Sequence, residues 1–157
     1  MIKLIRTTGN SPDYVELTRQ LDVELHGIYG ELQCKYDVFN RVYDIDTVLI
    51  AYDDDNPIGC GCFKRYDDKT AEIKRMFVQL EFRNRKIAGL MLQELESWSI
   101  EKGYSKFILE TGSNQPQAVA LYKRCGYRII ENFGQYEGDS NSICMFKGVQ
   151  ETKKPCC

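Results

Sequence analysis

The chain has 157 residues and a mass of 18.2 kDa, which suffices for one hydrophobic core but excludes a second full catalytic domain. Hydrophobic residues make up 43% and charged residues 28% of the sequence, as in ordinary globular proteins and unlike disordered chains. The formal net charge is −2, from 21 Lys and Arg against 23 Asp and Glu. This balance excludes an overall positive field that would attract nucleic acid or an anionic membrane. Neither is an expected partner, and any basic site must be local.

Seven cysteines are scattered through the sequence without a CxxC pair, and His26 is the only histidine. An odd number in this arrangement is typical neither of a disulfide framework nor of a zinc site, and no metal is expected. The first residues lack the apolar run of a signal peptide, and no stretch approaches the roughly 18 apolar residues of a membrane span. We therefore expect a reduced, cytoplasmic protein with one domain over residues 1–147 and a flexible polar tail over residues 148–157.

The first third of the sequence predicts a strand, a long helix and a short helix. Residues 2–6 alternate as a strand does, and Ser11 with Pro12 provides the N-cap and first-turn proline of a helix. This helix is expected to stop at Gly30, and its apolar face consists of Tyr14, Leu17, Leu21, Leu25 and Ile28. A shorter helix before Asp44 has the apolar residues Tyr36, Phe39 and Val42.

Three strands are predicted next, over residues 47–52, 58–64 and 71–78. The short turns between them predict an antiparallel meander. The period of the apolar residues then changes to that of a helix, which begins at Ile87 and ends at Gly103. Its apolar face includes Trp98, which is expected in the core.

The last third of the sequence predicts strands on both sides of another helix. Residues 106–110 form a strand parallel to the third meander strand, because a strand, helix, strand unit of this length is a right-handed crossover. A helix follows from Pro116 to Gly126 with Cys125 on its apolar face, where a buried residue is expected rather than a nucleophile. Residues 127–130 and 142–146 predict a terminal hairpin.

Three cations stand at the N-terminal end of the helix that begins at Ile87, namely Arg83, Arg85 and Lys86. The helix dipole disfavours positive charge there by about 0.3–1 kcal/mol per exposed residue. A bound phosphate or pyrophosphate would reconcile the cations with the free backbone N–H groups of the first turn. A solvated basic loop is the alternative, and the charges alone do not separate the two.

Two blocks of the sequence carry a resemblance to a known family. Residues 83–88 match the first and last positions of the pyrophosphate loop Gln/Arg-x-x-Gly-x-Gly/Ala, with Lys86 in place of the middle glycine. Residues 110–127 look like the later strand, helix and Gly-aromatic corner of the same family. Either block alone is a weak signal, but the two in this order are a strong one. From residue 2 to residue 146 the sequence resembles the GNAT superfamily of acetyl-CoA-dependent N-acetyltransferases.

The resemblance implies an α/β (α+β) GNAT fold, with a mixed, mostly antiparallel sheet and helices on both faces. It implies an acyltransferase that moves an acetyl group from the cosubstrate acetyl-CoA to a primary amine of a small molecule or peptide by direct attack, without a covalent enzyme intermediate. A non-catalytic module that binds or senses acyl-CoA and a protein-acetylating enzyme remain as alternatives. The sequence leaves the amine acceptor and the oligomeric state open, a homodimer included.

The resemblance also assigns cofactor-binding residues. The backbone of Met76, Phe77 and Val78 would hold the acetyl carbonyl and the pantetheine arm, at a bulge where the sheet of the family opens. Gln115 stands where many members have an asparagine that contacts the cofactor arm. The pyrophosphate would lie on Arg83, Asn84, Arg85, Lys86, Ile87, Ala88 and Gly89.

Two residues are candidates for the proton transfers of the reaction. An alkylammonium acceptor has a pKa of about 10.4, so a base is needed near neutral pH, and Glu72 matches a position where several members place one. The alternative for Glu72 is an exposed strand glutamate paired with Lys74 or Arg75. Tyr122 matches the tyrosine that protonates the departing thiolate in the family, and it is equally suited to be a core aromatic residue. The histidine is expected to be a surface residue.

Overall fold

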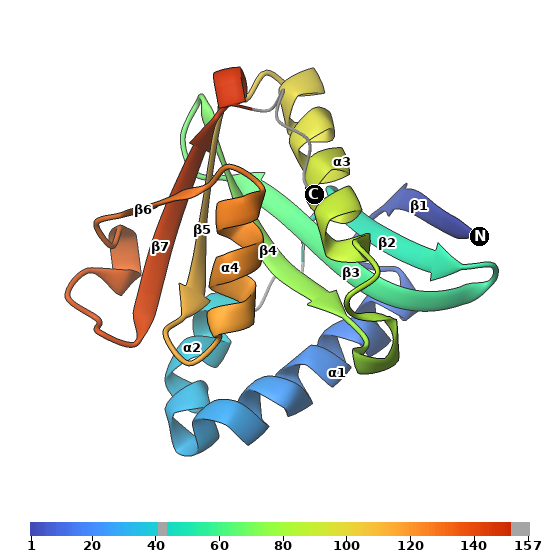
Figure 1. Ribbon diagram of the computed structural model, residues 1–157, viewed down its shortest axis with the longest axis horizontal. Coiled ribbons are helices and arrows are strands. Elements are labelled where there is room, and N and C mark those ends of the chain that lie inside the picture. The colour runs from blue at the N-terminus through green and yellow to red at the C-terminus, as the bar shows by residue number, and fades with distance from the viewer. Residues whose placement is uncertain (41–43, 152–157) are drawn as a thin grey trace.

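The computed structural model describes residues 1–40 and 44–151 as a seven-stranded sheet with helices on both faces (Figure 1). The strand order is β1-β2-β3-β4-β5-β7-β6, and β4 with β5 is a parallel pair while the other neighbours are antiparallel. The expected mixed, mostly antiparallel α/β fold is therefore confirmed. The strands are β1 (Ile2–Thr7), β2 (Val48–Asp53), β3 (Asn56–Arg65), β4 (Thr70–Val78), β5 (Lys106–Gly112), β6 (Arg128–Ile130) and β7 (Ser142–Gly148). The helices are α1 (Pro12–Tyr29), α2 (Gln33–Asn40), α3 (Ile87–Glu101) and α4 (Pro116–Arg124).

The α1 helix begins and ends at the signals that the sequence contains. The Ser11 hydroxyl accepts a hydrogen bond from the Tyr14 backbone N–H at 3.4 Å, and Gly30 caps the other end with a φ of +58°. The predicted apolar face is wrong only at its last position, because Ile28 is exposed. After Leu21 and Leu25, the i+4 spacing continues to Tyr29, which turns toward the sheet instead.

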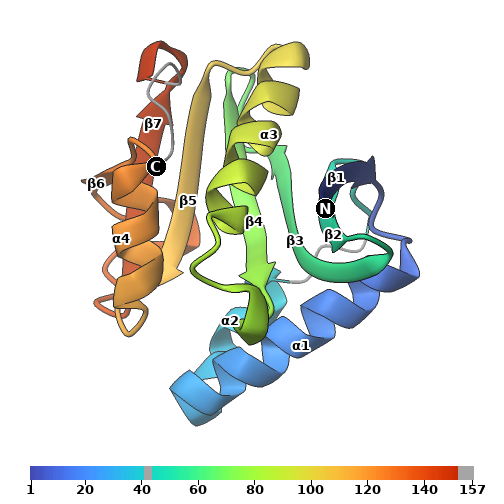
Figure 2. The same cartoon turned by 45° about the vertical axis from the view of Figure 1, so that its right-hand side comes forward.

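The sheet separates two apolar cores. The larger core packs α3 and α4 against one face and is centred on residues such as Leu49, Phe107 and Leu109. The smaller core packs α1 against the other face through Leu17 and Leu21. Figure 2 shows α3 and α4 on the near face of the sheet and α1 crossing its lower end. Among the described residues, no helix is long and apolar enough to cross a membrane.

The most important feature of the sheet is the opening between β4 and β5. These strands pair only from Thr70 with Lys106 to Glu72 with Ile108, and then diverge, as Figure 2 shows. At the same point, β4 bulges against β3, and Arg75 takes a φ of +58°. An added Cβ on Gly61, opposite the bulge, would lie 2.5 Å from the Met76 sulfur, so the glycine leaves room for this bulge.

The predictions for the terminal hairpin, for Cys125 and for Trp98 are confirmed. The strands β6 and β7 form the expected hairpin, Cys125 is buried, and Trp98 is partly buried with its ring edge-on to Phe63 at 5.5 Å. Val42 and the side chain of Phe39 lie outside the described residues. Of the expected tail, residue 148 ends β7, residues 149–151 form a short 3-10 turn, and residues 152–157 lie outside the described residues.

Candidate active site

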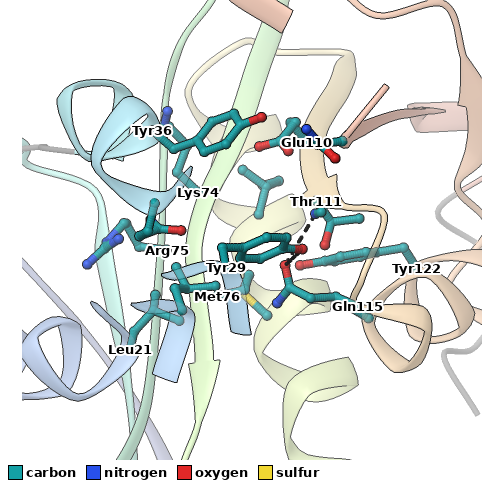
Figure 3. Close-up of a pocket in the computed structure, with 16 residues that line it drawn as sticks. Leu21, Tyr29, Tyr36, Lys74, Arg75, Met76, Glu110, Thr111, Gln115 and Tyr122 are labelled. Atoms are coloured by element: carbon teal, nitrogen blue, oxygen red, sulfur yellow. Dashed lines mark hydrogen bonds between the residues drawn. The ribbon is translucent and has the colours of Figure 1, made fainter. Parts of the chain in front are cut away.

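A pocket of about 130 Å³ lies in the opening between β4 and β5 (Figure 3). It is lined from four directions, by the end of α1 and the start of α2, by the bulged part of β4, by the end of β5, and by α4. The lining residues are Leu21, Leu25, Tyr29, Gln33, Tyr36, Ile73, Lys74, Arg75, Met76, Glu110, Thr111, Gly112, Gln115, Ala118, Tyr122 and Asn141.

The pocket crosses the sheet from one face to the other. Side chains alternate along a strand, so Leu109 of β5 belongs to the core under α3 and α4, while Glu110 faces the side of α1 and α2. On β4, Ile73 belongs to the same core as Leu109, and Lys74 faces the other side. The opening therefore joins an α4 side to a more polar α1–α2 side, in a way that two substrates could approach from opposite faces.

Glu110 is the titratable group best placed in this opening. Burial raises the pKa of its carboxyl to about 7, against the lowering effects of Ser142 and Lys74. A carboxyl with that pKa is half ionised at neutral pH, which suits a general base. The sequence patterns do not single out Glu110. The signal that points to it is its place near the end of a strand, one residue after the core residue Leu109.

Glu72 lies next to the pocket but does not line it. It is at the last paired position of β4 with β5, its side chain is 4% exposed, and its carboxylate is 3.7 Å from the Lys74 ammonium and 3.9 Å from that of Lys64. The predicted pairing with Lys74 therefore exists, although Glu72 is buried and not exposed. Arg75 pairs instead with Asp22 of α1 at 2.8 Å.

Tyr122 packs in the core and also faces the pocket. Its ring is 8% exposed and packs edge-on against Tyr127 with the ring centres 5.9 Å apart. Its hydroxyl end points into the pocket, toward Tyr29 and Gln115 (Figure 3). Burial raises the pKa of the Tyr122 hydroxyl, so that the hydroxyl keeps its proton at neutral pH and can act as a donor.

Gln115 holds the α4 side of the pocket together. Its side-chain oxygen accepts hydrogen bonds from the Gly112 backbone N–H at 3.2 Å and from the Tyr29 hydroxyl at 3.3 Å. The end of β5, the start of α4 and the end of α1 therefore meet at this one amide.

The three loop cations differ in what they contact. Arg83 donates to the backbone oxygen of Val78 at 2.7 Å and pairs with Glu24 of α1 at 2.7 Å, so it ties the loop to β4 and α1. Arg85 and Lys86 are exposed, and the Arg85 guanidinium lies 5.2 Å from the centre of the Phe82 ring. Local positive charge at the start of α3 therefore comes from Arg85 and Lys86.

The first N–H groups of α3 make no hydrogen bond within the helix. Asn84 and Lys86 both have left-handed φ angles, of +64° and +63°, and Lys86 is the N-cap residue without a side-chain capping bond. The first bond back into the helix is from the Leu90 N–H to the Lys86 oxygen, which leaves the N–H groups of residues 87–89 without a partner inside the helix. Lys86 adopts the conformation for which the matching family position has glycine.

The other residues that the sequence analysis singled out lie on β4, at the start of α3 and on α1. Met76, Phe77 and Val78 follow the bulge of β4, and both Phe77 and Val78 are buried. Ile87 and Gly89 are buried in the first turn of α3, next to partly buried Ala88. His26 is exposed on α1, 3.4 Å from the Asp37 carboxylate.

Comparison with known proteins identifies the family. A sequence model of the acetyltransferase (GNAT) family matches residues 15–127. The chain belongs to this family. The IAA acetyltransferase of Azospirillum brasilense is 30% identical over 141 residues, which are 85% of this chain and 88% of that protein. The enzyme is therefore an acyltransferase of the GNAT type.

Solved structures of the family share the fold. The PaiA N-acetyltransferase of Thermoplasma acidophilum, in complex with coenzyme A, superposes with a TM-score of 0.71 at 18% identity over 94% of this chain and 99% of that one. A GNAT family acetyltransferase from Elizabethkingia anophelis with acetyl-CoA bound gives 0.67 at 21% identity, over 94% and 97%. At these identities the comparison supports the fold alone.

The left-handed conformation of Lys86 predicts that glycine at this position gives a more stable protein than alanine does. A left-handed residue with a Cβ costs about 1–2 kcal/mol, and glycine avoids that cost. The free energy of unfolding of Lys86→Gly should therefore be at least about 0.5 kcal/mol higher than that of Lys86→Ala, as measured by urea denaturation. Both variants lose the same charge, so the comparison isolates the backbone. Equal stability, or a more stable alanine variant, would contradict the left-handed cap.

Proposed function

We propose that this GNAT enzyme transfers an acetyl group from acetyl-CoA to a primary amine of a small molecule or peptide by direct attack. The observation that carries the proposal is the Glu110 carboxyl, which has a pKa of about 7 and lies in the opening between β4 and β5. Acetyl-CoA as cosubstrate is supported by the family and by the relatives of this fold that bind coenzyme A or acetyl-CoA. The free cysteines of the described residues support a reducing, cytoplasmic location.

The cofactor would enter from the side of α3 and α4. Its pyrophosphate would accept hydrogen bonds from the backbone N–H groups at the start of α3, beside the exposed cations Arg85 and Lys86. Its pantetheine arm would follow the backbone of residues 76–78, which lacks a strand partner on the side toward β5. Gln115 would contact the arm, while Arg83 would act through its bonds to Val78 and Glu24 rather than on the phosphates.

The acceptor amine would approach from the side of α1 and α2. Glu110 takes a proton from the ammonium, directly or through a water molecule, and the neutral amine attacks the thioester carbonyl carbon. The new C–N bond forms, the C–S bond breaks, and the sulfur leaves as a thiolate that the Tyr122 hydroxyl protonates. The second proton, which the nitrogen loses after the attack, restores the Tyr122 hydroxyl through water, and Glu110 releases its own proton to solvent. Acetyl amide and CoA are the products, and the enzyme carries no acyl group at any step.

Glu110 is preferred to Glu72 as the base because it lines the opening. Glu72 is at the closed end of the opening, beside Lys64 and Lys74, and does not line the pocket. Its negative charge still matters, because it is one of the charges that raise the pKa of Glu110. We therefore propose that Glu72 tunes the base and that Glu110 is the base.

Cofactor binding is tested by thermal unfolding with CoA. At about 100 times its dissociation constant, CoA should stabilise the fold by about 2.7 kcal/mol, or several degrees in melting temperature. Arg85→Ala should reduce this shift with little change in the melting temperature of the free protein. Arg83→Ala, the matched variant, should instead lower the melting temperature of the free protein, because Arg83 bonds to Val78 and Glu24. The absence of any shift with CoA or acetyl-CoA would refute the proposal.

The role of Glu110 predicts a pH dependence of turnover with acetyl-CoA and an amine found by screening. A base must be ionised, so turnover of the wild-type enzyme should rise about tenfold per pH unit below about 7 and level off above it. Glu110→Gln should lose this inflection and about 10²–10⁴-fold of turnover near neutral pH, with a deficit that shrinks toward the pKa of the amine.

Glu72→Gln is the matched control for Glu110→Gln. It removes a charge that raises the pKa of Glu110, so the inflection should move to lower pH and remain visible. Loss of the inflection in Glu72→Gln, with its retention in Glu110→Gln, would exchange the two roles. Saturable CoA binding without turnover of any amine would identify the alternative, a non-catalytic binding module.

Tyr122→Phe separates packing from catalysis, because it keeps the ring and deletes the hydroxyl. We expect turnover to fall by about 100-fold, the lower end for a general acid, since a thiolate with a pKa near 8.5 can leave without a proton. Acetyl-CoA affinity and melting temperature should change little, because the edge-on contact with Tyr127 remains. Unchanged turnover would show that Tyr122 only packs.

A further inference from the structure

Tyr29, the last residue of α1, crosses the opening between β4 and β5. Its hydroxyl donates to Gln115 at 3.3 Å, from α1 to the start of α4. A Cβ added to Gly112 would lie only 1.5 Å from the Tyr29 hydroxyl oxygen and 2.5 Å from the ring carbon that bears it. The end of the ring therefore lies directly on the backbone of β5, with no room for an atom between them.

The Tyr29 ring stands between the groups that would meet during the reaction. In Figure 3 it lies in the middle of the pocket, with Met76 of β4 on one side and Gln115 with Tyr122 on the other. It comes from the face of the sheet on which Glu110 lies, and its hydroxyl reaches the face from which the cofactor arm would enter. The Tyr29 ring therefore limits the space where the α4 side and the α1–α2 side of the opening meet.

The helix that carries Tyr29 is held by two ion pairs from one earlier turn. Asp22 pairs with Arg75 of the bulge at 2.8 Å, and Glu24 pairs with Arg83 at 2.7 Å. The Arg75 side chain is only 6% exposed and the Asp22 side chain is 44% exposed, so the first of these pairs is buried at the sheet and open to solvent at the helix. Both pairs therefore hold α1 against the bulge of β4 and the loop before α3, a few residues before Tyr29.

We propose that Tyr29 determines acyl-group specificity by limiting the acyl chain of the thioester to about the size of acetyl. The inference rests on the proposed function, because it requires that the acyl end of the cofactor lies in this opening. The pocket of about 130 Å³ is somewhat smaller than a cavity of about 150 Å³ that holds one benzene molecule. Such a space takes an acetyl group and the end of an amine, but a longer acyl chain needs the volume that Tyr29 occupies.

Direct binding of CoA thioesters tests this proposal without a known acceptor. Dissociation constants of CoA, acetyl-CoA and butyryl-CoA are measured by calorimetry for the wild-type enzyme, Tyr29→Ala and Tyr29→Leu. One methylene group is worth about 10–200-fold in an apolar pocket, and we take the lower end because polar side chains such as Lys74 and Glu110 line part of this one. We expect the wild-type enzyme to bind butyryl-CoA at least tenfold more weakly than acetyl-CoA, and both variants to reduce this ratio to less than about threefold.

Tyr52→Ala is the matched control, because Tyr52 does not line the pocket and its hydroxyl donates to Asp13 of α1 at 2.6 Å. It removes the same volume and should keep the wild-type ratio. Thermal unfolding of each variant verifies folding, and Tyr29→Leu keeps an apolar side chain at the helix end in case the alanine variant is unstable.

Gly112→Ala tests the same contact from β5, the strand on which the end of the Tyr29 ring lies. Gly112 does not have a left-handed φ, so its backbone accepts a side chain, and the added methyl group conflicts chiefly with Tyr29. It should weaken acetyl-CoA binding in the wild-type background by pushing Tyr29 into the opening, and have little effect in Tyr29→Ala.

Two negative results would have different meanings, one for the role of Tyr29 and one for the proposed function. A wild-type enzyme that binds CoA and its thioesters, but with the same ratio in Tyr29→Ala, Tyr29→Leu and the parent, would overturn the role of Tyr29 alone. A wild-type enzyme that binds neither CoA nor its thioesters would overturn the proposed function, and the inference with it.

Discussion

After Glu72 and Ile108, β4 and β5 no longer pair, and most of the candidate site follows from that divergence. Buried backbone groups need hydrogen-bond partners, so a sheet that opens in its middle is stable only if something else occupies the opening. Here the bulge at Arg75 and the side chains of Glu110, Gln115 and Tyr29 fill part of it. The proposed ligand, an acyl-pantetheine chain with its own amide groups, would complete it.

The charged residues around the opening divide into those that pair with other elements of the protein and those that stay exposed. Arg75 and Arg83 pair with Asp22 and Glu24, and so bind α1 to both the bulge and the loop before α3. Such pairs contribute little when exposed but define geometry when partly buried. Arg85 and Lys86 remain exposed beside the N-terminus of α3. These two cations are where the proposed pyrophosphate would bind on a protein whose overall charge is close to neutral.

The sequence predicted the order and type of the elements well, because caps and periodicity are local signals. Ser11, Gly30 and the change of period after residue 78 are examples. The sequence could not show that Arg83 forms an ion pair with Glu24. It also could not show that Tyr29, and not Ile28, turns toward the sheet, because both features depend on how α1 crosses the sheet. The buried environment that raises the pKa of Glu110 arises only when β7 and the start of α2 surround β5. The family resemblance indicated Glu72 as the base. Glu72 lies on β4, the strand next to the one that carries Glu110, and its carboxylate is beside Lys74.

The most direct test of this account is a crystal structure with acetyl-CoA. It should have the pyrophosphate on the backbone N–H groups of residues 87–89 and the thioester between the backbone that follows the bulge and the Tyr122 hydroxyl. The Glu110 carboxylate should face the carbonyl carbon across a space that fits an amine or one water molecule. A thioester outside the opening between β4 and β5, or one that faces Glu72 while Glu110 points away, would contradict the account.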